Sequence, residues 1–111
     1  MENIFNYKIV TNGDMASSIT SQDVDLSKAV GYAIYAKWTG ATAAGTIKIM
    51  VAVNEYDFVD LKDSEQIVAG ASDFMWNVRD VFYDKVKVVF TRSGGTGILN
   101  VQINGKGDER S

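Results

Sequence analysis

The sequence contains no cysteine, no histidine and no proline. Without cysteine there is no disulfide, no thiol nucleophile and no cysteine-held zinc site. Without histidine the chain lacks the commonest transition-metal ligand and the usual general base. Without proline the backbone N–H groups can all join sheet ladders, and turns must depend on glycine, asparagine and aspartate. We therefore expect no metal, no cofactor and no enzymatic activity.

The sequence also lacks long hydrophobic runs and clustered positive charge. No stretch approaches the ~18 consecutive apolar residues that span a membrane. The segment Met1–Asn6 has neither the basic residues nor the apolar run of a signal peptide. The net charge is −3, and the basic residues are scattered along the chain. We therefore expect synthesis in the cytoplasm as a soluble protein, with no membrane and no nucleic acid as partner.

The strongest positive signal is an alternation of apolar and polar residues. The 111 residues are 46% hydrophobic, which is enough for one domain with one core. Four alternating runs predict half-buried β-strands at residues 31–40, 46–53, 85–92 and 97–104. Their predicted inward residues are Tyr32, Ile34, Ala36, Trp38, Ile47, Ile49, Val51, Val53, Val86, Val88, Phe90, Leu99, Val101 and Ile103. We expect both tryptophans, Trp38 and Trp76, to pack in the core.

Shorter apolar segments complete the predicted architecture. They indicate further strands at residues 5–10, 16–20, 58–61, 66–69 and 74–76, with a loop or single helical turn at 77–84. No connection is long enough for a parallel βαβ unit. The sequence therefore predicts an all-β fold, an antiparallel, jelly-roll-like β-sandwich of about eight short strands. Residues 1–105 should form this single domain, and residues 106–111 a flexible charged tail.

The glycine-rich segment Gly94-Gly95-Thr96-Gly97 raises the question of phosphate binding. A phosphate-binding loop needs a Lys-Ser/Thr pair and a following helix, whereas here an alternating run follows. We interpret residues 93–97 as the turn of a β-hairpin between the last two runs. The segment 40–45, with glycine at each end, should likewise join the first two runs as antiparallel neighbours.

Acidic, aromatic and hydroxyl side chains supply the remaining candidates for a site. The acidic residues of one segment are Asp57, Asp60, Asp63 and Glu65, and a solvated loop face is favoured over a calcium site or a glycosidase carboxylate pair. Tyr35 projects from the polar face of its run and Tyr56 from a loop. Tyr35, Tyr56, Asp57 and Asp60 are therefore the candidate contacts for a partner or a glycan. The hydroxyl-rich stretch Ser17, Ser18, Thr20 and Ser21 lacks an activating base.

The order of these segments resembles a family of small bacteriophage virion proteins. The similar pieces are "GYAIYAKWTG" at 31–40, "GTIKIMVAVN" at 45–54, the Trp-containing 74–77 and "VKVVFTRSGGTGILNVQINGKG" at 86–107. Together they span roughly residues 15 to 107. One departure is visible at Val53-Asn54-Glu55, where the family tends to have Ser-Asn-Asp.

The resemblance implies a compact β-sandwich that assembles on a virus particle. The expected protein is a capsid decoration, minor capsid or head-tail component, located in the virion. Its partners would be other virion proteins and further copies of itself. A carbohydrate- or receptor-binding module, based on Tyr35, Tyr56 and the acidic segment 54–65, is the alternative.

Overall fold

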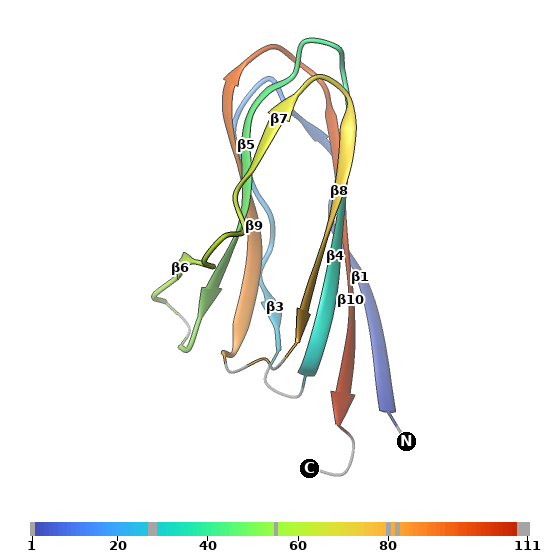
Figure 1. Ribbon diagram of the computed structural model, residues 1–111, viewed down its shortest axis with the longest axis vertical. Coiled ribbons are helices and arrows are strands. Elements are labelled where there is room, and N and C mark those ends of the chain that lie inside the picture. Colours follow the sequence, from blue (N-terminus) through green and yellow to red (C-terminus); the bar gives the residue numbers. More distant parts are fainter. Residues whose placement is uncertain (1, 27–28, 55, 80, 82, 109–111) are drawn as a thin grey trace.

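The computed structural model of the chain describes residues 2–26, 29–54, 56–79, 81 and 83–108. These residues form two facing antiparallel sheets (Figure 1). Sheet A has the order β1-β10-β4-β8, with β1 (Glu2–Asp14), β10 (Ile98–Asp108), β4 (Ala29–Thr39) and β8 (Ser72–Arg79). In sheet B, β9 (Lys85–Gly94) pairs with β5 (Ala44–Ala52) at the centre. Its edges are β2 (Ile19–Thr20) with β3 (Val24–Asp25), and β6 (Val59–Asp60) with β7 (Gln66–Ala69).

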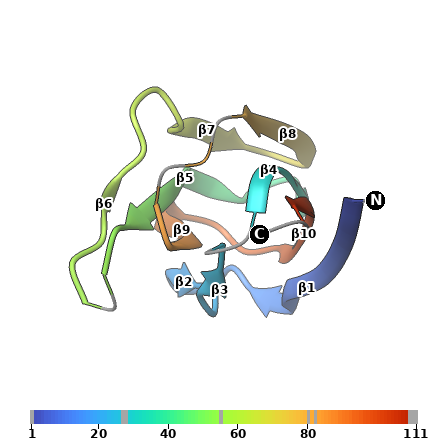
Figure 2. The ribbon, with the colours of Figure 1, turned by 90° about the horizontal axis from the view of Figure 1, so that it is seen from below.

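The ten strands occupy eight positions, because both edges of sheet B are broken into two pieces. Strands β2 and β3 both pair with β9, and strands β6 and β7 both pair with β5. The connection from β5 to the edge formed by β6 and β7 stays within sheet B. At each other connection between the eight strand positions the chain changes sheet, as the end-on view shows (Figure 2). Antiparallel strands that alternate in this way between two sheets make a jelly roll. The predicted fold class is confirmed.

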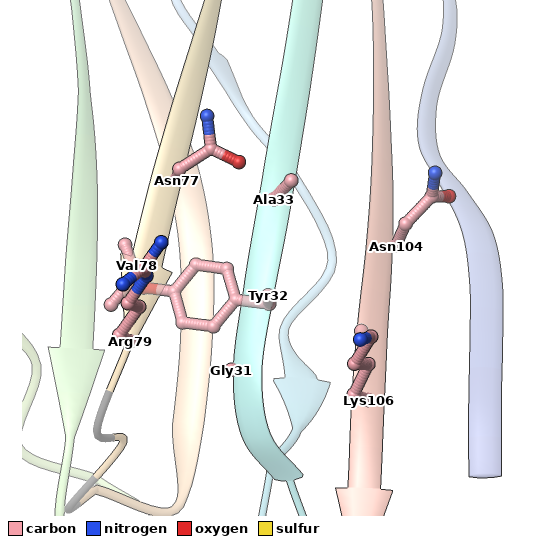
Figure 3. A pocket seen from close by; sticks show the side chains of 9 residues that line it. Gly31, Tyr32, Ala33, Asn77, Val78, Arg79, Asn104 and Lys106 are labelled. Carbon is pink, nitrogen blue, oxygen red and sulfur yellow. The ribbon is translucent and has the colours of Figure 1, made fainter. Parts of the chain in front are cut away.

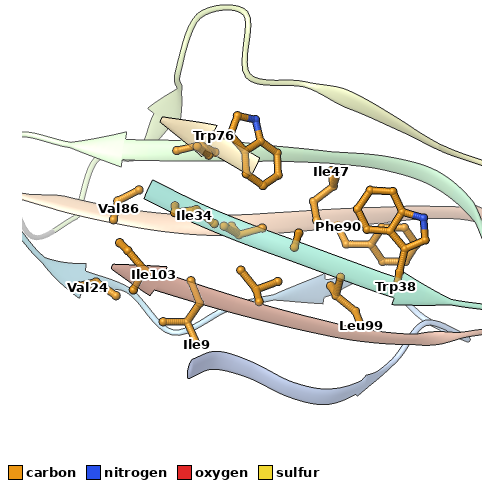
Figure 4. Close-up of a cluster of buried hydrophobic side chains, with 14 of the residues drawn as sticks. Ile9, Val24, Ile34, Trp38, Ile47, Trp76, Val86, Phe90, Leu99 and Ile103 are labelled. Carbon is orange, nitrogen blue, oxygen red and sulfur yellow. The ribbon is translucent and has the colours of Figure 1, made fainter. Parts of the chain in front are cut away.

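The core lies between the sheets and contains the predicted inward residues except Val53 (Figure 4). It also contains buried residues that the four alternating runs did not include, namely Ile9, Met15, Val24, Leu26, Ala43 and Val68. Both tryptophans are buried, and each indole N–H donates to a backbone carbonyl, Trp38 to Gly70 and Trp76 to Ser64, at 2.8 Å. Each fully buried Leu, Ile, Val or Phe contributes about 1.5–3 kcal/mol. The face prediction is wrong at the end of the run 46–53. Val53 lies beyond the end of β5 and is exposed, and Ala52, which the alternation places on the opposite face, is buried.

The weaker strand predictions are correct in type and differ mainly in extent. Strand β7 has the predicted bounds, whereas β1 and β8 are longer than predicted and β2 is shorter. Residues 77–79 belong to β8 instead of the predicted loop, and β3 was not predicted. At the C-terminal end β10 continues to Asp108, past the boundary predicted at residue 105, and residues 109–111 lie outside the described residues.

The two predicted hairpins are wrong. Strands β9 and β10 do not pair with each other, because β9 belongs to sheet B and β10 to sheet A. Residues 40–45 likewise connect β4 in sheet A to β5 in sheet B. Both glycine-bounded segments therefore carry the chain across the sandwich from one sheet to the other.

These two crossovers pack against each other backbone to backbone. The Thr96 N–H donates to the Thr42 hydroxyl at 3.2 Å, and a Cβ on Gly95 would collide with the Thr42 carbonyl. Gly95 has a φ of 71°, in the left-handed region that favours glycine. Gly97 abuts the carbonyl of Thr39 in the same way. The glycine-rich segment therefore allows close approach of two chain segments.

Two buried serines replace the missing ladder bonds where the edge strands of sheet B are broken. The Ser64 hydroxyl, between β6 and β7, accepts from the N–H of Ile49 at 3.1 Å and donates to its carbonyl at 3.2 Å. The Ser21 hydroxyl, between β2 and β3, accepts from the N–H of Val88 at 2.8 Å. The hydroxyl-rich stretch 17–21 thus supplies sheet bonding for β9.

A tyrosine pair closes one part of the core. The hydroxyls of Tyr32 and Tyr83 lie 2.6 Å apart, and their rings meet edge to face with centroids 6.4 Å apart. Burial is the main cause that raises the pKa of Tyr32 above its ordinary value, followed by the hydrogen bond with Tyr83. Burial also raises the pKa of Tyr83. Both phenols therefore resist ionisation in the folded state.

We expect Gly95→Val to destabilise the protein strongly and Gly94→Val to have little effect. Valine at 95 would have to adopt a positive φ and would meet the Thr42 carbonyl, whereas a Cβ at 94 meets nothing within 4 Å. The cost at 95 should be about 3 kcal/mol or more, against about 0.5 kcal/mol or less at 94. Urea unfolding followed by tryptophan fluorescence measures both. Equal stability of the two variants would contradict the crossover packing.

The serine replacement predicts a difference between a buried and an exposed hydroxyl. Ser64→Ala leaves the buried N–H of Ile49 without its acceptor, which should cost about 1–3 kcal/mol. Ser18→Ala removes a similar bond, from the N–H of Arg92, at an exposed site where water can substitute. The control should lose less than about 1 kcal/mol. Thermal and urea unfolding of both variants test this, and an unaffected Ser64→Ala would refute it.

The tyrosine pair predicts a loss of stability at alkaline pH. The folded-state pKa of both residues is raised, so their contribution is complete below the unfolded-state pKa of about 10 and is lost as the pH rises above it. Tyr32→Phe should make the fall in unfolding free energy shallower by up to about 1.4 kcal/mol per pH unit. Urea titrations between pH 8 and 11.5 measure this slope, with Tyr56→Phe at an exposed site as control. Identical slopes in both variants would contradict it.

Candidate functional site

Tyr35 lies at the centre of the outer face of sheet A. Its neighbours in register are Met75 on β8 and Gln102 on β10. The side chain is 36% exposed, and its hydroxyl donates to the Asp73 carboxylate at 2.7 Å. This hydrogen bond is the main cause that raises the pKa of Tyr35 above its ordinary value. Tyr35 therefore offers a surface ring whose orientation is held by a neighbouring strand.

A trough runs beside Tyr35 on the same face of sheet A. Its floor is formed by Gly31 and Ala33 of β4, and its volume is about 650 Å³. Figure 3 shows Asn77 and Asn104 on the strands to either side of Ala33, and the trough is also lined by Arg79 of β8 and Lys106 of β10. The trough exists because the middle strand carries small residues between two strands with long polar ones. Sequence analysis did not predict this trough. It could have been inferred from the two small residues Gly31 and Ala33, which occupy alternate positions on the outward face of their run.

Tyr56 and Asp57 lie in the connection between β5 and β6. The side-chain oxygen of Asn54 accepts from the N–H groups of Tyr56 and Asp57, each at 2.8 Å. The Asn54 amide also donates to the Asp57 carboxylate at 2.9 Å. Asp57 therefore stabilises the turn, while the Tyr56 side chain is 83% exposed. Glu55, where the sequence departs from the phage family, lies outside the described residues.

Asp60 and its neighbour Phe58 contact basic residues of sheet B. The Asp60 carboxylate pairs with the Lys48 ammonium at 3.0 Å, from β6 to the adjacent β5. The Lys87 ammonium lies 4.1 Å from the centroid of the Phe58 ring. Exposed pairs of this kind contribute about 0–1 kcal/mol each. They hold the segment after β5 against the outer face of sheet B.

The four candidate contact residues do not form one site. Tyr35 belongs to sheet A, whereas Tyr56, Asp57 and Asp60 belong to the segment that follows β5 of sheet B. Among the described residues no group of three or more acidic side chains is placed to hold a metal ion. Within the same residues there is also no helix long and apolar enough to cross a membrane. The structure therefore offers two separate surfaces, the trough face of sheet A and the β5–β6 connection.

Comparison by sequence finds no matching protein-family model and no matching curated protein. Comparison of folds finds the SPBc2 prophage-derived protein YomS, with a TM-score of 0.62 and 10% identity over 96% of this chain and 95% of YomS. The infectious bursal disease virus Gx strain matches with a TM-score of 0.53 and 9% identity, over 95% of this chain but 32% of the viral chain. PirA matches with a TM-score of 0.53 and 15% identity over 88% of this chain and 90% of PirA. At these identities the likeness establishes a shared fold, found in a prophage-derived protein and in part of a viral chain.

Proposed function

We propose that this protein is a non-enzymatic structural component of a bacteriophage virion, joined to the particle by protein–protein contacts. The observation that carries the proposal is the fold shared with YomS over nearly the whole of both chains. The ordered segments that resemble phage virion proteins support it independently of the fold comparison. A capsid decoration, minor capsid or head-tail position fits both observations.

The use of the reactive side chains supports a role without catalysis. The hydroxyls of Ser18, Ser21 and Ser64 accept hydrogen bonds from the backbone of the central strands of sheet B. The carboxylates of Asp57 and Asp60 bind neighbouring side chains of their own segment and sheet. These five side chains, which could act as nucleophiles or acids, thus contribute to holding the fold together. This is the pattern of a scaffold that works through its surface.

The β5–β6 connection is the surface that we assign to the virion partner. Figures 1 and 2 show the segment around β6 at the edge of sheet B, on the side of β5 away from β9. It carries three exposed apolar side chains, Val53, Tyr56 and Val59. Exposed tyrosine is enriched at the energetic centres of protein interfaces, because its ring covers a large area at a small entropic cost. The Asn54 turn orders the backbone before binding, which lowers that cost further.

Binding to purified particles of the encoding phage tests this function. The labelled chain should co-sediment with the particles in a saturable ratio. Tyr56→Ser should weaken that binding by about tenfold or more, with an unchanged melting temperature because the ring is exposed. Ile98→Thr, a similar change at another exposed apolar site, is the control and should bind normally. No binding to particles by the unaltered chain would rule out the proposed function.

A further inference from the structure

Strand β8 is an open edge of sheet A. It lies at the end of the strand order and pairs only with β4, from Gly31 opposite Arg79 to Trp38 opposite Ser72, without a shift in register. None of the other backbone hydrogen bonds between described residues involves β8. An open edge presents a row of N–H and C=O groups to which another strand can be added.

The other three sheet edges carry features that hinder strand addition. Strand β1 has register shifts between Lys8 and Val10 and between Val10 and Gly13. Both edges of sheet B are broken, into β2 with β3 and β6 with β7. Strand β8 instead runs for eight residues without a break, and its only charged residues, Asp73 and Arg79, lie near its two ends. Among the described edges β8 is therefore the one suited to pairing.

We propose that β8 pairs antiparallel with β8 of a second copy of this chain, so that sheet A continues through both copies. Directly opposite residues in antiparallel strands point to the same face, and successive residues alternate between faces. The two copies of β8 would be related by a two-fold axis perpendicular to the sheet. If this axis passed midway between two successive residues, each residue would lie opposite one that points to the other face. The axis must therefore pass level with one residue, which then lies opposite its own copy. The candidate centres in the middle of β8 are thus Met75, Trp76 and Asn77.

Charge selects Trp76 as the centre. With the axis at Trp76, Asp73 lies opposite the partner's Arg79 and Arg79 lies opposite the partner's Asp73. An axis at Met75 or Asn77 separates these charges. Opposite charges across a strand pair are stabilising, and the two-fold axis creates the contact twice.

The immediate surroundings of Asp73 and Arg79 leave both groups accessible. Both lie on the outer face of sheet A, in the same rows as Lys37 and Gly31 of β4. Asp73 accepts one hydrogen bond, from Tyr35, and Arg79 makes no ion pair with another described residue. On the inner face the same pairing places the half-buried Phe74 opposite the partner's Val78, so that apolar surface is covered as well.

The inference goes beyond the proposed function and does not depend on it, and its test uses the purified chain without virus particles. Sedimentation velocity over a range of concentrations should show a species of twice the 12.1 kDa chain mass. Arg79→Glu sets like charges opposite each other twice and should weaken dimerisation by about tenfold or more. Asp73→Lys should do the same, and the double variant Asp73→Lys/Arg79→Glu should restore the dimer. Lys8→Glu, a matched charge reversal on β1, should leave it unchanged.

Hydrogen exchange gives a second measurement that needs no variant. The backbone amides of β8 should exchange more slowly as the concentration rises through the dimerisation range, while those of β1 should not change. A chain that stays monomeric at millimolar concentration would overturn the inference. So would a dimer that is insensitive to Arg79→Glu or that protects a different strand. Because Tyr56 lies outside β8, loss of particle binding and loss of dimerisation are separate results.

Discussion

The arrangement of the whole molecule depends on the close contact between two crossover segments at one end of the sandwich. There the backbone of Gly95 and Gly97 meets the carbonyls of Thr42 and Thr39, with no room for a side chain between them. This contact ties the β4–β5 connection to the β9–β10 connection, so the central strands of both sheets are linked at one place.

The same arrangement gives two buried hydroxyl groups a structural role. A jelly roll has four sheet edges, and in sheet B both edges are broken at a serine whose hydroxyl completes the ladder of the adjacent central strand. These two hydroxyls, on Ser21 and Ser64, satisfy backbone groups of the central strands. The outer surface offers three places for contact, namely the β5–β6 connection, the trough face of sheet A and the open edge of β8.

The candidate site could be predicted only in part. Sequence analysis selected Tyr35 and Tyr56 correctly as side chains outside the core. Alternation along its strand showed that Tyr35 points outward, and Tyr56 was assigned to a loop. Sequence analysis could not say whether they lie on one surface, and they do not, because Tyr35 belongs to sheet A and Tyr56 to the segment that follows β5 of sheet B. The roles of Asp57 and Asp60 depend on Asn54 and Lys48, and the Lys48 contact arises from the pairing of β6 with β5. No pattern of neighbouring residues in the sequence predicts the pairing of β6 with β5.

The sequence by itself determined the four long alternating strands and most of their inward side chains. A two-residue period is a local property, so Ile34, Phe90 and Val101 could be assigned to the core before any strand had a partner. Only the tertiary structure decided which strands pair. Two alternating runs joined by a short glycine turn bury the same side chains whether they form a hairpin or cross to opposite sheets. The choice follows from the packing of distant segments, as where Gly95 meets Thr42, and residues next to each other in the chain carry no signal of it.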